Sequence, residues 1–125
     1  MYKIEISEAA KADIKEILSY IKDSLHNPKA ASNLADLLAR EISSLSQHPH
    51  SGTPVQDRFL ANYGFRFLLV KNFKVFYITI DQVDNNQVHI IRVLYARRDY
   101  ETILNNPHEP NDALERLFDP EKKKQ

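Results

Sequence analysis

The residues of this sequence that could do chemistry are basic side chains set among apolar and aromatic residues in its second half. Arg66, Lys74 and Arg97 each interrupt an apolar run or stand at its end, and Tyr95 and Tyr100 lie near them in the sequence. Arginine and lysine hold phosphates and stabilise the negative charge that develops in a transition state. Tyrosine can stack on a nucleobase or act as a weak acid or base. The set therefore predicts phosphate chemistry or a charged partner, unless strand alternation simply puts these side chains on the solvent face of a sheet.

The sequence does not indicate a disulfide, a metal site or a phosphate-binding loop. The chain has no cysteine, which excludes disulfides and cysteine-bound metals, and it has only two glycines, too few for a phosphate-binding loop. His48 and His50 lie two residues apart in an expected loop, with no third metal ligand close to them in the sequence. We therefore expect no metal site and no cofactor.

Length and charge indicate an ordinary globular domain. The 125 residues carry 17 basic and 17 acidic side chains, so the formal net charge is zero. That balance is not typical of a protein that binds nucleic acid through its overall charge. No stretch is long and apolar enough to span a membrane, and the N-terminus lacks the apolar segment of a signal peptide. We expect a cytoplasmic protein that does not contact a membrane.

The basic residues lie within or just after a predicted three-stranded meander. The strands are rich in aromatic and β-branched residues and comprise residues 65–70, 73–80 and 87–95. Apolar side chains occupy both alternating faces of the second strand, so both faces need cover. The middle strand of a meander lies between the other two. Arg66, Lys74 and Arg97 can therefore converge if they share a face, a condition that the sequence leaves open.

Two amphipathic helices upstream can provide this cover. Residues 2–6 alternate as a strand does, Ser7 can cap a helix that runs to about residue 25, and Asn27 with Pro28 can start a second helix that ends near residue 47. The short break between the helices makes them an antiparallel hairpin. The predicted fold is α+β, with the order β-α-α-β-β-β and the helical hairpin packed on a mostly antiparallel sheet.

The connections and the tail complete the expected domain. Residues 55–64 are expected to be a connector anchored to the core by Phe59, Leu60 and Tyr63. A short helix is expected over residues 98–104, after the last strand. We place the domain at residues 1–104 and a partly flexible tail at residues 105–125, within which residues 113–118 could form a further short helix.

Several short motifs occur along the chain in one order and spacing. They are Tyr20-Ile21, Asn27-Pro28-x-Ala30-Ala31, Leu45-x-x-His48-Pro49-x-x-Gly52, Phe73-Lys74-Val75-Phe76-Tyr77 and Arg92-Val93-Leu94-Tyr95-Ala96-Arg97-Arg98-Asp99. Taken together, over most of residues 2–104, they resemble the RelE/ParE superfamily of toxins from bacterial type II toxin–antitoxin systems. The resemblance implies the fold predicted above and a toxin that is silenced by tight binding to a cognate antitoxin.

The superfamily divides by target, and the resemblance favours one branch. RelE-like members cleave mRNA in the ribosomal A site without a metal, whereas ParE-like members poison DNA gyrase. The helical hairpin, its Pro-Gly exit and the turn at residues 94–99 are more similar to the ParE branch, and the paired lysines of RelE-like members have no match here. The favoured function is gyrase poisoning. The alternatives are a ribosome-dependent mRNA endoribonuclease and an inactive toxin that keeps only antitoxin binding.

The two branches imply different roles for the same residues. A gyrase inhibitor would bind its target through Arg66, Tyr95, Arg97 and Arg98, whereas an RNA-cleaving enzyme would use Arg66, Lys74, Arg97 and Tyr100 as catalytic residues. The implied partners are the antitoxin and either gyrase or the ribosome with its mRNA, with operator DNA contacted only through the antitoxin. We expect Arg66→Ala combined with Arg97→Ala to abolish growth inhibition and to leave the fold and the thermal stability nearly unchanged.

Overall fold

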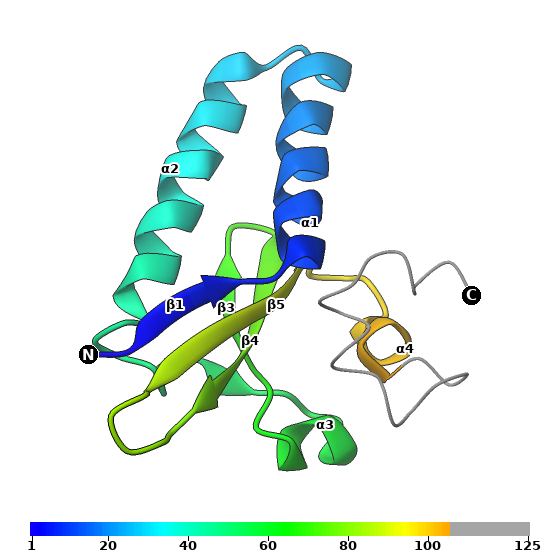
Figure 1. Cartoon of the computed structure of the whole chain (residues 1–125). Coiled ribbons are helices and arrows are strands. Elements are labelled where there is room, and N and C mark those ends of the chain that lie inside the picture. The colour runs from blue at the N-terminus through cyan, green and yellow to red at the C-terminus, as the bar shows by residue number, and fades with distance from the viewer. Residues whose placement is uncertain (106–125) are drawn as a thin grey trace.

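A five-stranded sheet lies at the centre of the computed structural model, which describes residues 1–105 (Figure 1). The strands are β1 (Lys3–Ile6), β2 (Thr53–Pro54), β3 (Arg66–Val70), β4 (Phe73–Ile80) and β5 (Gln87–Tyr95). Their order is β1-β5-β4-β3-β2, with β1 parallel to β5 and every other neighbouring pair antiparallel. The predicted opening strand and meander are confirmed. The predicted helix at residues 113–118 and almost all of the tail lie outside the described residues.

The helical hairpin also forms as predicted. Helix α1 (Glu8–Ser19) continues into a π-helical turn, η1 (Tyr20–Ser24), and α2 (Pro28–Ser44) returns beside it (Figure 1). The Ser7 hydroxyl oxygen accepts a hydrogen bond from the Ala10 N–H at 3.0 Å, and the Asn27 side chain accepts one from the Ala30 N–H at 3.1 Å. These are N-caps, which satisfy backbone donors that a helix leaves unpaired at its start. Among residues 1–105 no helix combines the length and the apolar character of a membrane span.

The hairpin covers one face of the sheet. Its apolar stripe and the side chains of β3, β4 and β5 that point toward it form one buried cluster: Ala10, Leu34, Leu38, Ile42, Leu45, Val70, Val75, Tyr77, Val88, Ile90 and Val93. The buried residues predicted for α2 lie three or four positions apart, which keeps them on one side of the helix. Burial against the sheet therefore stabilises helices of a length that is marginal in isolation.

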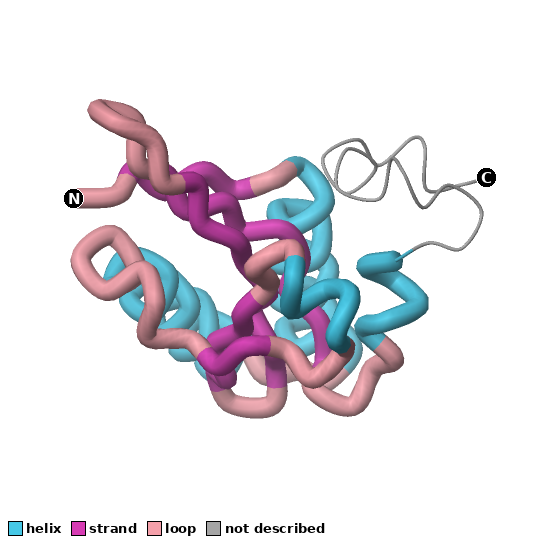
Figure 2. Tube along the Cα trace, turned by 90° about the horizontal axis from the view of Figure 1, so that it is seen from below, coloured by secondary structure: helices cyan, strands magenta, loops and turns pink. Residues whose placement is uncertain are grey.

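A second layer, not predicted as such, covers part of the other face. Helices α3 (Arg58–Asn62) and α4 (Tyr100–Asn105) lie side by side there, as both views of the chain show (Figures 1 and 2). Their buried cluster comprises Val55, Leu60, Phe65, Phe76, Ile91, Leu94 and Leu104. The prediction of a short C-terminal helix is confirmed, because α4 begins at Tyr100.

The predicted anchors of the connector need a correction. The connector contains α3, and of its three expected anchors only Leu60 is buried, at 1 % exposure. Phe59 and Tyr63 are 49 % and 51 % exposed and pack edge to face against each other, with ring centroids 5.1 Å apart. A helix of five residues presents a single narrow side to the sheet, and Leu60 occupies that side.

A β-bulge in β5 changes which residues face each layer. Phe76 pairs with Arg92 and Tyr77 pairs with Ile90, so Ile91 is an extra residue without a partner on β4. Ile90 and Val93 consequently face the hairpin, whereas Ile91 and Leu94 face the second layer. An extra residue reverses the alternation of the strand beyond it.

The bulge is tied to α1 by a largely buried ion pair. The Arg92 guanidinium donates two hydrogen bonds to the Asp13 carboxylate, from Nε at 2.6 Å and from Nη2 at 2.7 Å. The Val93 N–H donates a third at 2.9 Å, and the side chains of Arg92 and Asp13 are only 12 % and 14 % exposed. Arg92 is therefore a structural residue, and two bonds from one guanidinium fix the orientation of both partners.

We predict that Asp13→Ala lowers the free energy of unfolding by about 3–5 kcal/mol, because it leaves a buried guanidinium without its counter-charge. Urea denaturation measures the loss. Lys11→Ala is the control: it removes the exposed Lys11–Glu8 pair on the same helix, and such surface pairs contribute about 0–1 kcal/mol. Equal losses in the two variants would contradict the prediction.

Candidate functional site

Lys74 lies within a group of aromatic rings on the second-layer face of the sheet. Its Nζ is 4.4 Å from the ring centroid of Phe67 and 5.5 Å from that of Tyr100. The Tyr100 ring stacks on Phe76, with centroids 5.1 Å apart and an interplanar angle of 29°. The Tyr100 hydroxyl accepts a long hydrogen bond from the Asp57 N–H at 3.4 Å. The faces of these rings therefore hold the Lys74 ammonium group near Tyr100, the first residue of α4.

Arg66 lies on the opposite face of the sheet. It pairs with Tyr77, which faces the hairpin, and its guanidinium donates to the carbonyls of Gly52 at 2.7 Å and His50 at 3.3 Å. The Tyr77 hydroxyl accepts the Gly52 N–H at 2.9 Å, so both side chains hold the loop that follows α2. Arg66 and Lys74 do not converge, because residues in antiparallel register alternate between the two faces.

The Tyr77 hydroxyl, which is a titratable group, lies in close contact with Gly52. Burial raises the pKa of the Tyr77 hydroxyl, and the Gly52 N–H and the nearby Arg66 charge partly oppose that rise. A Cβ on Gly52 would lie 2.5 Å from the Tyr77 hydroxyl oxygen, so a larger side chain does not fit without movement of the loop. The neutral hydroxyl thus acts as a buried hydrogen-bond acceptor, and we assign it a structural role.

Arg97 and Arg98 are exposed in the turn between β5 and α4. The ion pairs formed within residues 1–105 include neither of them. The neighbouring Asp99 instead caps α4: its carboxylate accepts the Thr102 N–H at 3.3 Å and the Thr102 hydroxyl at 2.6 Å, and these bonds lower the pKa of Asp99. The two guanidinium groups are therefore available to a partner.

Tyr95 lies just before this turn and faces away from Tyr100. Its side chain is 45 % exposed, and its ring packs edge to face on Phe73, with centroids 6.0 Å apart. Of the predicted site residues, the structure brings Lys74 and Tyr100 together. Tyr95, Arg97 and Arg98 lie at the exposed end of β5. Arg66 lies on the opposite face of the sheet from Lys74, beside the loop that follows α2. No group of three or more His, Asp or Glu side chains in the described part of the chain is placed to hold a metal ion.

An apolar groove lies between α1 and α2, and no pattern singled out in the sequence predicted it. It has a volume of about 650 Å³, and its apolar wall comprises Ile6, Ile14, Leu18, Pro28, Ala31 and Ala35. Lys11 and Lys15 on α1 and Lys22 on η1 also line it, together with one carboxylate, Asp23. A second hollow of about 390 Å³ shares Ile6, Ile14 and Ala35 and extends the groove along β1. We call the two together the hairpin groove. The pair Ala31 and Ala35, one helical turn apart, was the available signal for it.

Comparisons with known proteins place the chain in a family. A family model described as the ParE toxin of the type II toxin–antitoxin system parDE matches residues 4–100. The chain belongs to the ParE toxin family. The expected membership of the RelE/ParE superfamily is thereby confirmed, and the protein is a toxin-family member of the type II toxin–antitoxin class.

Solved structures agree on the fold of this ParE-family chain. It is similar to a chain of the chromosomal ParDE system from P. aeruginosa, with a TM-score of 0.62 and 18 % identity over 78 % of this chain and 98 % of that one. It is also similar to a chain of the RelBE2 toxin–antitoxin complex from Mycobacterium tuberculosis, with a TM-score of 0.51 and 19 % identity over 75 % and 96 %. At such identities the likeness concerns the fold alone. No curated protein matches the sequence significantly.

The two arginines of the expected double variant should differ in their effect on stability. We predict that Arg66→Ala lowers the free energy of unfolding by about 1–3 kcal/mol, because two loop carbonyls lose a charged donor. Arg97→Ala should change it by less than about 0.5 kcal/mol, as surface substitutions do. Urea denaturation of the single variants tests this, and equal effects would contradict it. The expectation that the double variant keeps its stability is revised accordingly.

Proposed function

We propose that this ParE-family toxin poisons DNA gyrase and that a cognate antitoxin neutralises it. The observation that carries the choice of target is the division of the basic residues between two faces of the sheet. Cleavage of RNA needs phosphate donors and an acid or base around one bond. Here Arg66 holds a loop on the hairpin side, and the Lys74 ammonium is covered by rings on the other side. The match to the ParE rather than the RelE branch supports the same target.

A ribosome-dependent endoribonuclease is the second candidate. One observation favours it: Lys74 lies 5.5 Å from the Tyr100 ring, so a cation and a phenol hydroxyl occur on one face of the sheet. Against it, the Tyr100 ring is stacked on Phe76, and its hydroxyl accepts a hydrogen bond from the Asp57 N–H. An inactive toxin that keeps only antitoxin binding is the third possibility, and the experiment below separates the three.

The hairpin groove supports the antitoxin part of the proposal. The faces of the sheet are not open to an antitoxin at β4, because helices cover Val75 and Tyr77 on one face and Phe76 on the other. The groove remains open, and β1 beside it is an edge strand with β5 as its only partner in the described sheet. Its apolar wall, and the excess of three lysines over the one carboxylate Asp23 in its lining, suit an amphipathic segment with acidic residues, which can fold as it binds. Operator DNA would then be contacted through the antitoxin.

The target can be decided with the purified full chain in two assays. We predict inhibition of gyrase supercoiling and no cleavage of mRNA on programmed ribosomes. Tyr100→Phe should leave gyrase inhibition unchanged, because it removes only a hydroxyl with one long hydrogen bond. Cleavage on ribosomes that falls with Tyr100→Phe would establish the endoribonuclease instead, and activity in neither assay would indicate an inactive toxin.

The antitoxin surface can be tested by co-expression. Ala35→Glu puts a carboxylate into the apolar wall of the hairpin groove, and a buried unpaired charge is costly. We predict that this variant no longer co-purifies with the antitoxin and that the antitoxin no longer rescues growth. Ala12→Glu is the matched control, because Ala12 is an exposed helical alanine outside the groove. If Ala35→Glu binds the antitoxin as tightly as Ala12→Glu does, the groove is not the docking surface.

A further inference from the structure

The turn between β3 and β4 and the segment after β5 meet at one end of the sheet. The Ala96 N–H donates a hydrogen bond to the Asn72 carbonyl at 2.7 Å, and Phe73 pairs with Tyr95. Lys71 holds the turn in the left-handed region, with φ of 54°. The exposed residues Lys71, Arg97 and Arg98 therefore stand on two segments that are bonded to each other.

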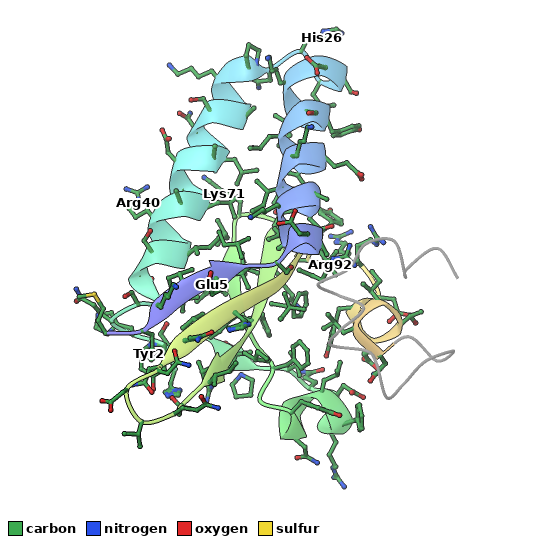
Figure 3. All side chains as sticks on the ribbon, in the orientation of Figure 1. Tyr2, Glu5, His26, Arg40, Lys71 and Arg92 are labelled. Carbon is green, nitrogen blue, oxygen red and sulfur yellow. The ribbon has the colours of Figure 1, made fainter. Side chains whose placement is uncertain are left out.

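A polar hollow extends this end toward α2. It has a volume of about 550 Å³ and is lined by Asn33, Asp36, Leu37, Arg40 and Lys71. Figure 3 labels two of them, Arg40 on α2 and Lys71 at the turn that is seen between α1 and α2. A cation thus reaches the hollow from each side, and Asp36 is the one carboxylate in its lining.

None of the four cations at this end forms an ion pair within the described chain. We call Arg40, Lys71, Arg97 and Arg98 the basic end. The ion pairs of residues 1–105 join Lys3 to Glu5, Lys11 to Glu8 and Arg92 to Asp13, all outside this set. Two carboxylates stand among the four cations: Asp36 lines the hollow, and Asp99 caps α4 through Thr102. A protein with zero net charge therefore carries a local excess of positive charge here.

We propose that the basic end binds the phosphate backbone of duplex DNA without reading its sequence. The inference deepens the proposed function and rests on it, since the DNA segment held by gyrase is the natural duplex for the toxin to contact. The cations stand on exposed turns and a helix surface. Tyr95 is the one large exposed aromatic residue among the neighbouring segments, and its ring packs on Phe73. Single strands are bound by several aromatic rings that stack bases, and that platform is missing from these segments.

This contact differs from operator recognition. Phosphate contacts position a protein on DNA but carry no sequence information. Each phosphate that a lysine or arginine neutralises releases counterions, so the affinity falls as salt rises. The basic end should therefore bind any duplex with low affinity by itself and should increase the affinity of the toxin for the gyrase–DNA complex.

Fluorescence anisotropy of the full chain with a short labelled duplex, without gyrase, tests the inference. We expect log K to fall with log salt between about 50 and 200 mM with a slope of about −3 to −4 for four cations. Arg97→Glu with Arg98→Glu should weaken binding about tenfold or more and reduce the slope by about 2. Both residues are exposed and without ion pairs in the described chain, and circular dichroism verifies that the variant is folded.

The matched control is Lys29→Glu with Arg58→Glu, which changes the net charge by the same amount. Lys29 and Arg58 lie in the first turns of α2 and α3, where an acidic side chain is favourable, and they stand away from the basic end. Equal weakening by both double variants, binding without salt dependence, or tighter binding of a single-stranded RNA than of the duplex would overturn the inference. A wild-type chain that inhibits gyrase without binding duplex refutes this inference alone. One that binds duplex and fails to inhibit gyrase refutes the proposed function.

Discussion

The contact between Asp13 and Arg92 is the interaction on which the rest of the structure depends. It joins the first long helix to the bulge of β5, the strand that lies between β1 and β4. Removing two charges from water is costly, and their attraction compensates only when the remaining hydrogen-bonding groups are satisfied. Here one carboxylate accepts both guanidinium bonds and the Val93 N–H. The pair therefore fixes the helix, the bulge and the strand beyond it in one arrangement.

That arrangement separates basic residues that hold the fold from basic residues that are left for partners. Arg92 forms the ion pair at the bulge, and Arg66 donates to carbonyls of the loop after α2. Lys74 lies against aromatic rings near the start of α4. Arg97 and Arg98 come after the bulge, where β5 ends and the chain turns into α4. Because the first three of these side chains are engaged by other groups of the chain, we propose the exposed end of the sheet, with Arg97 and Arg98, as the surface that binds the target. The hairpin groove and the polar hollow at the basic end share no lining residue, so the proposed target and antitoxin surfaces are different.

Much of the fold could be read from local patterns, and the misses have physical reasons. The caps at Ser7 and Asn27, the stripe on α2 and the break at Lys71 each depend on a few neighbouring residues, and all of them occur as predicted. Helix α3 was missed because five residues carry too little periodicity to indicate a helix. The bulge was missed because the sequence of β5 is apolar on both alternating sets, so that an extra residue leaves no trace in the pattern.

The sequence by itself determined the order of the main helices and strands, without β2 and α3, the two-sided apolar sheet and the resemblance to toxins. These follow from residue types at short spacings. The sequence also singled out Arg66, Lys74, Arg97 and Arg98, but it gave no role to Lys71 or Arg40, which join the basic end only in the fold. Only the tertiary structure decided which of these residues act together. Strand register puts Arg66 and Lys74 on opposite faces, and the bond from Ala96 to Asn72 brings Lys71 to the end of β5. Such proximity depends on pairing between distant segments, and pairing is set by the burial of whole faces rather than by any local motif.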